Sequence, residues 1–551
     1  MSADRIARLD ALFARPAAAA EPGCAALLLD RGEVVWRTHQ GLAHLAARRP
    51  IDAQTRFRVC SITKPMFALA LAALEGQGVL SFDDPLARYV PELRIAHRPT
   101  LAHAMGMKSG IFETYPLTWL ALGPAAPQGV RLDQVLGLQL AQTRTNFAPG
   151  ERTLYSNTNY LLLQLAAERA SGLACGELLR RYVFDPAGMA GAALADGPAA
   201  RLRDAALAYA KAEDGFAPDD PDVAFGASGA VVATIDDMAA WWRWLRTDPY
   251  GWRARLAGPS RHRDGGESAY GLGFARHRIS GRLALGHSGG ASSWLCDTMW
   301  MADEDVAAVV LGNRSDINWI ERTREMLTIW TGIAPDPAAA PRLCRPAAPE
   351  PLWTATYGDE ASGASVTLRG APGEVECDGR PYPRAEDGLF RRSVGVEPIS
   401  LRIEGDLLSA PASIVRREGD VEARMVLADP ATAPALAGLV GTYGHPDLPE
   451  PLRLWLEEGE LKLAVGAPWP SGAPLVLRHV VGRLFHAYDA QGVAQELHLA
   501  FELGADGEAV GATASFLRIT AYPLSRLSRT IEEGSRRFSS RTAAMMAWRA
   551  E

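Results

Sequence analysis

Ser61 and Lys64 lie three residues apart at the start of a small-residue-rich helical run, within "RFRVCSITKPMFALALAALEGQGVLSFDDP". Residues i and i+3 share a helix face, so this spacing brings a hydroxyl and an amine together. The chain has 57 basic residues but only four lysines, at 64, 108, 211 and 462. Arginine keeps its proton in proteins, whereas a buried lysine can lose it. The pair predicts an activated serine with a neutral amine beside it. The same spacing would also occur if the serine only capped the helix and the lysine lay on its first turn without a chemical role.

Tyr155 and Asn157 form a second short motif, in "FAPGERTLYSNTNYLLL". A tyrosinate beside a lysine ammonium can take the proton of a serine hydroxyl and later pass it to a leaving amine. The Asn157 amide could hold a substrate amide or orient Lys64. A tyrosine at such a place is, by itself, more typical of half-buried packing.

The third motif is "LGHSGGASS", with His287, Gly289 and Gly290 near the end of an expected strand. His287 could donate to a substrate or to Tyr155, although an isolated histidine before a turn is usually structural. The glycines would let the strand backbone approach an acyl carbon, with the Gly290 N–H as an oxyanion donor beside that of Ser61. The three motifs together predict a serine nucleophile more strongly than any of them alone.

Composition and charge narrow the class of protein. The 551 residues and 59.2 kDa predict two to four domains. A formal net charge of −7 argues against a nucleic-acid partner. The amino-terminal segment lacks the pattern of a secretory signal, and no run of 18 apolar residues predicts a membrane span. Six dispersed cysteines suggest free thiols and a cytoplasmic location, and the chain lacks sequence signatures for metal or nucleotide, so we expect no cofactor.

The elements that must position these residues fall into a large first part and two small ones. A hairpin turning at Asp30–Gly32 and late strands after Gly281 should form one antiparallel sheet, with terminal helices on it and a helical lobe between. Proline- and alanine-rich linkers at 334–351 and 428–438 divide the chain into domains at 1–333, 350–429 and 438–530. Both small domains begin with a Thr-Tyr-Gly string and continue with short strands and turns, which predicts two antiparallel β-barrels or sandwiches.

The combination resembles the penicillin-recognising serine hydrolases: class C β-lactamases, D,D-peptidases, related esterases and D-aminopeptidases. The likeness runs from about Ala3 to Thr331 and rests on the strings "VCSITKPMFALALAALEGQGVLSFDDPLARYVPEL", "TLAHAMGMKSGI", "FAPGERTLYSNTNYLLL", "GASGAVVATIDDMAAW" and "GHSGG". It implies an α/β, β-lactamase-like catalytic domain followed by two antiparallel β-barrels. It also implies that Ser61 is the nucleophile, that Lys64 and Tyr155 manage protons, and that Asn157 and His287 line the site.

Within this group the chain looks most like D-aminopeptidase, because two barrels follow the catalytic domain and Cys60 precedes the serine. That resemblance implies release of an N-terminal D-amino acid from peptides, amides or esters. In D-aminopeptidase a loop of the last barrel reaches the substrate amine. Here the candidates are Tyr488–Gln495, which we favour with Asp489 as the counter-charge, and Gly504–Gly511.

Two departures from the family pattern bear on the substrate. Met107–Gly110 replaces the usual His-Thr-Ser-Gly string, and a histidine stands at 287 where β-lactamases usually carry lysine. A histidine is less permanently cationic near neutral pH, which weakens recognition of a carboxylate there.

The sequence therefore predicts a serine hydrolase acting through an acyl-enzyme, with D-aminopeptidase as the expected activity and a homodimer as a further possibility. An esterase or β-lactamase-like enzyme of the same chemistry is one alternative. A non-catalytic binding or assembly protein on this fold is another, although an intact set of Ser61, Lys64 and Tyr155 argues against it.

Overall fold

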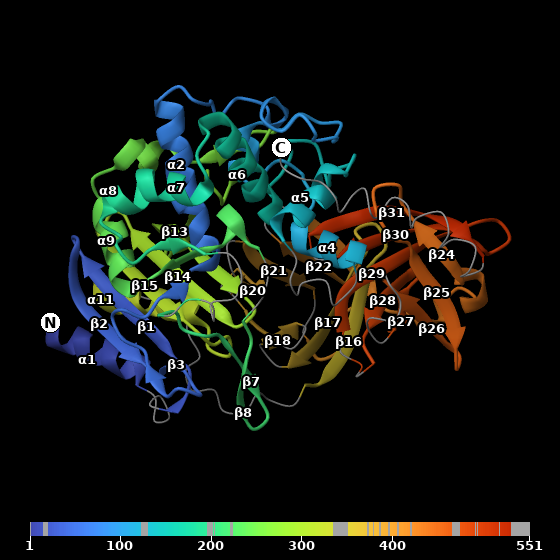
Figure 1. Cartoon of the computed structure of the whole chain (residues 1–551). Helices are drawn as coiled ribbons and strands as arrows, with labels where there is room; N and C mark the ends of the chain where they lie inside the picture. The colour runs from blue at the N-terminus through green and yellow to red at the C-terminus, as the bar shows by residue number, and fades with distance from the viewer. Residues whose placement is uncertain are drawn as a thin grey trace.

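The computed structural model describes most of the chain between residues 2 and 529 (Figure 1). The description leaves out residues 1, 15–19, 123–130, 196–201, 203, 221–223, 334–350, 372–373, 378–379, 385–386, 395–396, 405–406, 419–420, 466–473, 491, 493, 517 and 530–551. The first predicted linker therefore lies almost wholly outside the described residues.

A six-stranded antiparallel sheet forms the centre of the first part. Its strands, in spatial order, are β12 (Ala275–Ile279), β13 (Arg282–Ala291), β14 (Trp294–Met301), β15 (Val306–Gly312), β1 (Cys24–Asp30) and β2 (Glu33–Gln40). The β1–β2 hairpin turns at Arg31 and Gly32, whose φ angles of 51° and 86° are those of a tight hairpin turn. The late strands pair with this early hairpin, as the sequence predicts.

Helices cover both faces of the sheet. On one face α1 (Ser2–Phe13) and α11 (Trp319–Thr331) share a buried apolar cluster with residues such as Leu28 and Met299. On the other face α9 (Ile235–Leu245) packs on β1 and β15, and α2 (Thr63–Gly76) lies in the larger cluster that joins the sheet to the helical lobe. The lobe contains α3 (Leu101–Met105), α4 (Thr114–Leu122), α5 (Leu132–Leu140), α6 (Asn157–Ser171), α7 (Cys175–Leu179), α8 (Asp185–Ala187) and α10 (Trp252–Arg255). Short strand pairs and bridges connect these parts: β3 (Leu42–His44), β4 (Arg49–Pro50), β5 (Phe57–Arg58), β6 (Ala193–Leu194), β7 (Tyr209–Ala212), β8 (Gly215–Pro218), β9 (Val231–Ala233), β10 (Ser260–Arg261) and β11 (Glu267–Ser268).

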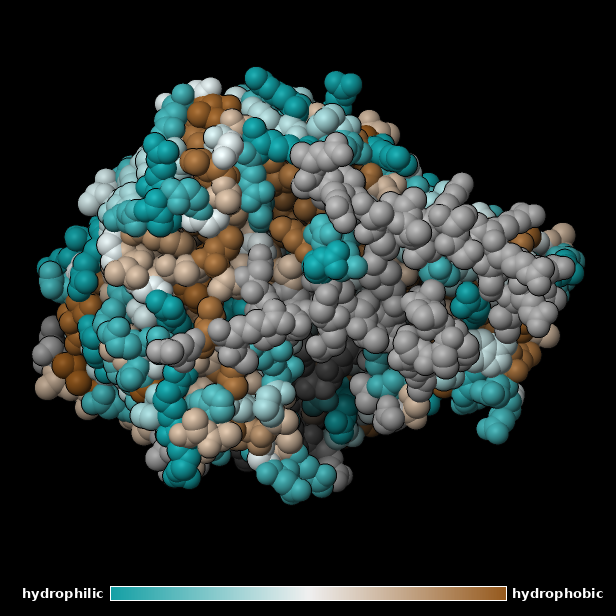
Figure 2. Space-filling view, viewed as in Figure 1, coloured by the Kyte–Doolittle hydropathy of each residue, from teal (hydrophilic) through white to brown (hydrophobic). Residues whose placement is uncertain are grey.

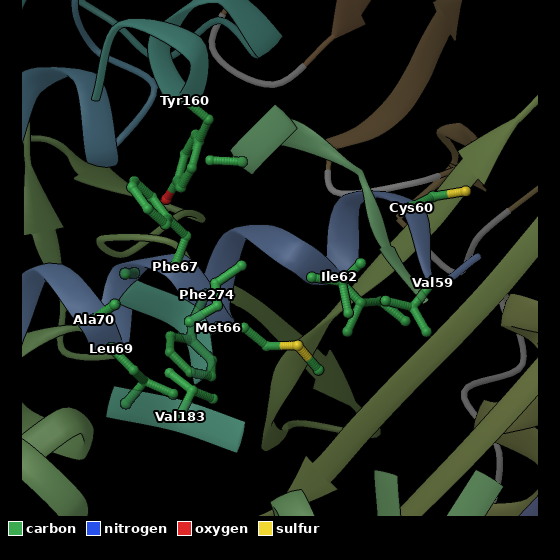
Figure 3. Packing of buried hydrophobic residues seen from close by; sticks show 14 of the residues in the cluster. Val59, Cys60, Ile62, Met66, Phe67, Leu69, Ala70, Tyr160, Val183 and Phe274 are labelled. Carbon is green, nitrogen blue, oxygen red and sulfur yellow. The ribbon is translucent and has the colours of Figure 1, made fainter. Parts of the chain in front are cut away.

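Helix α2 is buried on all sides. Every residue from Thr63 to Leu74 is buried, which explains why this helix is apolar around its whole circumference and has no polar face. Lys64 is the one charged residue among them. Figure 3 shows part of the packing around the helix, with side chains of Met66, Phe67, Leu69, Ala70, Tyr160, Val183 and Phe274. A helix held in this way fixes the residues at its start.

Two eight-stranded antiparallel sheets follow. The first has the order β19-β18-β17-β16-β23-β22-β21-β20, and an isolated bridge between Arg384 and Phe390 joins its two edges, so it is nearly closed. The second, β24 to β31 in sequence order, is a closed barrel. The predicted architecture of a catalytic domain followed by two barrels is therefore confirmed. The Thr-Tyr-Gly strings lie in the opening strands β16 and β24, where Tyr357 and Tyr443 are both buried. The strands are β16 (Trp353–Asp359), β17 (Ala364–Ala371), β18 (Glu374–Cys377), β19 (Arg380–Pro383), β20 (Phe390–Val394), β21 (Glu397–Ile403), β22 (Ser413–Glu418) and β23 (Val421–Leu427), then β24 (Gly441–Gly444), β25 (Leu452–Glu457), β26 (Glu460–Ala464), β27 (Leu475–Val481), β28 (Leu484–Tyr488), β29 (Ala494–Leu503), β30 (Ala509–Phe516) and β31 (Ile519–Ser528).

The closed barrel is docked on the helical lobe. Its interior forms one apolar cluster with α4 and α5, which lie beside β31 in Figure 1. Trp119 of α4 stacks on Phe516 of β30, with ring centroids 4.7 Å apart. Tyr522 of β31 donates from its hydroxyl to Gln142 Oε1 at 2.9 Å. A shared core of this kind fixes the barrel relative to the first part more firmly than a flexible linker would.

Apolar side chains appear between hydrophilic ones on the face of the first part that Figure 2 shows. Across the described residues, no helix is both long enough and apolar enough to cross a membrane.

Candidate active site

Ser61 lies in a short 3-10 turn, Cys60–Ile62, that runs directly into α2. Cys60, just before it, has a φ of 50°, a value that non-glycine residues adopt rarely and that is often found where the backbone is shaped for function. The turn packs against β13 and β14. Burial raises the pKa of the Cys60 thiol to about 12, so this cysteine is a packed thiol.

The Lys64 amine has three hydrogen-bond acceptors around it. Its Nζ lies 3.0 Å from Ser61 Oγ, 2.7 Å from Asn157 Oδ1 and 2.6 Å from the Ser228 carbonyl oxygen. The side chain is fully buried, and this burial lowers its pKa from the usual value to about 7, even though Glu113 acts in the opposite direction. Near neutral pH the amine is therefore poised between its charged and neutral forms.

Asn157 is held in place by a carboxylate. Glu113 accepts hydrogen bonds from the Asn157 backbone N–H at 2.6 Å and from its Nδ2 at 2.8 Å. Glu113 is itself buried. Because the carboxylate only accepts, it must face the NH2 end of the Asn157 amide, which turns the Oδ1 end toward Lys64.

Two cations lie over the ring of Tyr155. Its ring centroid lies 4.9 Å from Lys64 Nζ and 4.7 Å from Cζ of Arg518, which comes from the closed barrel. The tyrosine is buried, and its ring also lies edge-on to that of Tyr270, with centroids 6.3 Å apart. The structure thus brings Ser61, Lys64, Tyr155 and Asn157 together.

His287 is completely buried, and the two nitrogens of its ring both have partners within the protein. Nδ1 lies 2.5 Å from the Ser288 carbonyl oxygen, which can only accept, and Nε2 lies 2.9 Å from the Tyr270 hydroxyl. The ring must therefore carry its proton on Nδ1 and accept from Tyr270. Burial, helped by the charge of Lys64, lowers the His287 pKa to about 3, so the ring is neutral near pH 7. Its contact with Tyr155 is between rings, with centroids 6.1 Å apart.

The glycines after His287 lie on a free stretch of sheet edge. Strand β12 pairs with β13 only as far as Gly286. Among the described strands, the rest of β13 therefore pairs with β14 alone. A Cβ at Gly289 would lie 2.2 Å from the Val59 carbonyl oxygen and 3.1 Å from the Ser61 backbone nitrogen. The strand backbone therefore approaches the backbone of Ser61 as closely as only glycine allows. At Gly290 the nearest atoms to such a Cβ are 3.6 Å away.

Asp489 follows β28, where its Oδ2 accepts from Gln495 Nε2 at 3.1 Å. A different barrel segment contacts Tyr155. It is the turn between β30 and β31, which carries Arg518. Both turns lie at the same end of the barrel, because the start of β29 pairs with the end of β30. Gly504–Gly511 contains the β29–β30 turn at the opposite end. The contact with Tyr155 thus comes from the turn next to the favoured one and brings a positive charge, while the role of Asp489 stays a prediction.

Three further residues of the site escaped the sequence analysis: Glu113, Tyr270 and Arg518. Glu113 had a signal, since it is the one acidic residue in the apolar stretch after Gly110. Tyr270 and Arg518 had none, because only the tertiary fold brings their loops to the serine. No group of three or more His, Cys, Asp or Glu that could hold a metal ion occurs among the described residues.

Similarity to known proteins extends over more than half of the chain. A family model described as Beta-lactamase matches residues 9–328. The D-aminopeptidase of Brucella melitensis biotype 2 is 28% identical over 410 residues, which are 73% of each chain. That of Brucella anthropi is 29% identical over 408 residues, 72% of this chain and 73% of the relative.

Solved structures show the same fold at lower identity. The octameric penicillin-binding protein homologue from Pyrococcus abyssi is similar with a TM-score of 0.53 and 17% identity, covering 95% of this chain and 97% of its own. A D-amino acid amidase from Ochrobactrum anthropi SV3, complexed with D-phenylalanine, has a TM-score of 0.50 and 17% identity, covering 60% of this chain and all of its own.

Proposed function

The chain belongs to the Beta-lactamase family and is a serine hydrolase of that family; from this premise we propose that it forms an acyl-enzyme on Ser61 and acts as a D-aminopeptidase. The substrate would be a peptide, amide or ester with an N-terminal D-amino acid. The observation that carries the proposal is the buried Lys64 amine 3.0 Å from Ser61 Oγ.

The proton chemistry follows from the three partners of Lys64. An ammonium has three N–H donors, whereas the neutral amine has two and a lone pair. The neutral amine can keep donating to Asn157 Oδ1 and to the Ser228 carbonyl, which leaves its lone pair facing Ser61 Oγ. Lys64 can therefore accept the Ser61 proton as the oxygen attacks the acyl carbon. A pKa of about 7 gives it the right protonation state at neutral pH.

Tyr155 and the β13 edge complete the proposed mechanism. Tyr155 lies beside the Lys64 amine and would pass a proton between Lys64 and the leaving amine. The backbone N–H groups of Ser61 and Gly290 would hold the oxyanion, and Gly289 permits the close approach that this requires. Water would then attack the acyl-enzyme and release the D-amino acid.

The D-aminopeptidase activity is supported by the Brucella relatives of that name. Their alignment with this chain is longer than the segment that the family model matches, so it extends into the part where the barrels lie. An esterase or a β-lactamase-like hydrolase would use the same site, and so a test must compare substrates. The predicted homodimer and the cytoplasmic location stay predictions.

Hydrolysis of D- and L-alanine p-nitroanilide, each with a free and an acetylated amine, tests the proposal. We expect turnover of the free D-substrate, with at least ~10²-fold preference over the L-form and loss on acetylation. Ser61→Ala should abolish both turnover and the acyl adduct seen by mass spectrometry with a reactive ester. Preference for simple esters or nitrocefin would favour the related hydrolases. The absence of any adduct on wild-type protein would favour a non-catalytic role.

A further inference from the structure

A turn of the closed barrel is fastened to the catalytic part next to the serine. Arg518 lies in this turn, between β30 and β31. The Asn146 side chain binds the turn at two points: its Nδ2 donates to the Arg518 carbonyl oxygen at 3.0 Å, and its Oδ1 accepts from the Thr520 N–H at 2.9 Å. Asn146 in turn donates its backbone N–H to the Gly110 carbonyl oxygen at 2.7 Å. The backbone from the Arg518 carbonyl to Thr520 is thus fixed by the catalytic part itself.

The Arg518 side chain extends from this turn over the ring of Tyr155. Its Cζ lies 4.7 Å from the ring centroid, slightly closer than Lys64 Nζ at 4.9 Å. An aromatic face stabilises a guanidinium without neutralising it, so the positive charge remains. The charge is felt at the proposed base, because Arg518 is one of the groups that lower the pKa of Lys64.

Glu113 is the opposing charge: it raises the pKa of Lys64 more than Arg518 lowers it, but it acts from the far side of the Asn157 amide. Glu113 is committed to the backbone and side-chain donors of Asn157. His287 is neutral near pH 7, because burial lowers its pKa to about 3. A ligand near Tyr155 therefore meets a fixed guanidinium, together with a lysine that is charged or neutral according to pH.

We propose that Arg518 is a specificity-determining residue that binds a carboxylate of the substrate, so that the preferred substrates are anionic D-aminoacyl peptides or amides. This inference rests on the proposed function and names the substrate class within it. Arginine presents several N–H donors in one plane, which match the two oxygens of a carboxylate. The cation comes from the barrel turn, not from position 287, where the family pattern usually has lysine.

The carboxylate has two possible sources on such a substrate. It can be the side chain of an N-terminal D-aspartate or D-glutamate, or the carboxyl terminus of a short peptide. Both present the same group to Arg518, but at different distances from the scissile bond. Matched substrates separate them: D-Glu against D-Gln p-nitroanilide for the side chain, and D-Ala-Gly against D-Ala-Gly amide for the terminus.

The experiment compares kcat/KM for these pairs in the wild type and in Arg518→Gln. In at least one pair we expect the carboxylate member to be favoured, and Arg518→Gln to remove this preference by lowering kcat/KM for that member by roughly 10- to 100-fold, the usual size of a lost hydrogen bond to a charged group. Loss of the Arg518 charge also lets the pKa of Lys64 rise, which affects both members of a pair alike, so the ratio of their kcat/KM values is the readout. Arg518→Lys should restore part of the preference. Arg529→Gln, an exposed arginine just after β31 whose partner is Asp506, is the matched control and should have no effect.

Calorimetric binding of the same pairs to Ser61→Ala gives a readout that does not depend on turnover. Tighter binding of a carboxylate member, lost when Arg518→Gln is added, supports the proposal even if the wild type hydrolyses none of these amides. In that case only the proposed aminopeptidase activity fails. Equal binding of both members of each pair, or a preference that survives Arg518→Gln, overturns the role of Arg518 and leaves the proposed activity untouched.

Discussion

Replacing Glu113 by glutamine should move the pH dependence of the reaction in a direction fixed by the structure. Glu113 raises the pKa of Lys64, while burial lowers it to about 7. Glutamine at this position removes the negative charge and keeps the size. The Lys64 pKa should fall further, so that the neutral amine is present at lower pH. We therefore expect the acid limb of kcat/KM, near pH 7 in the wild type, to move toward lower pH.

The size of the shift follows from the spacing of the two charges. Glu113 contacts Asn157 Nδ2 at 2.8 Å and Lys64 contacts Asn157 Oδ1 at 2.7 Å, so one amide group separates them. At roughly 7 Å, Coulomb's law gives about 0.6 kcal/mol at the dielectric constant of water and about 2.4 kcal/mol at an effective value of 20. These energies correspond to about 0.4 to 1.7 pKa units. The NH2 group of glutamine would also face one of the two Asn157 N–H donors that Glu113 now accepts. This donor would lose its acceptor, which should cost about 1–3 kcal/mol of stability.

The assay is the pH profile of kcat/KM for an ester or amide that the wild type hydrolyses, with thermal unfolding to confirm that the variant is folded. Glu92→Gln is a suitable control, because Glu92 is a more exposed carboxylate of the same lobe that pairs with Arg169. The control should keep the wild-type limb. A limb in Glu113→Gln that stays in place, or moves to higher pH, would refute the assignment of Lys64 as the titrating base.

Three further predictions concern the same residues. Lys64→Arg keeps the charge but removes the titratable amine, so kcat should fall by at least ~10²–10⁴-fold in steady-state assays. The free energy of unfolding should rise between about pH 7 and pH 10, because in this range Lys64 is protonated in the unfolded chain and neutral in the folded one. Urea unfolding at a series of pH values should show this rise in the wild type and not in Lys64→Met. Gly289→Ala places a Cβ 2.2 Å from the Val59 carbonyl oxygen and should cost about 1–3 kcal/mol and most of the activity, whereas Gly290→Ala, with nearest atoms 3.6 Å away, should fold normally by circular dichroism.

Local patterns explain why much of the arrangement could be predicted from the sequence. The Ser61–Lys64 contact depends on helical spacing alone, and the β1–β2 hairpin depends on a two-residue turn at Arg31 and Gly32. The contact of Tyr155 with Arg518 could not be predicted in this way. Arg518 reaches Tyr155 because the barrel is closed and docked on the helical lobe, a fact that no spacing between residues 155 and 518 records.

The docked barrel also helps to hold the proposed base, Lys64, in position. Phe112 and Glu113 are adjacent in sequence and face different parts of the molecule. The Phe112 ring packs on Tyr522 of β31, with centroids 5.4 Å apart, while Glu113 holds the amide of Asn157 against Lys64. The barrel therefore fixes one end of a two-residue segment whose other end orients the proposed base. Because neighbouring residues of one backbone segment cannot move independently, loosening the barrel should disturb Lys64 before it disturbs the sheet. Thus Tyr522→Ala should lower kcat and shift the pH limb at temperatures where circular dichroism still reports a folded chain; an unchanged limb would show that the barrel contributes only its arginine.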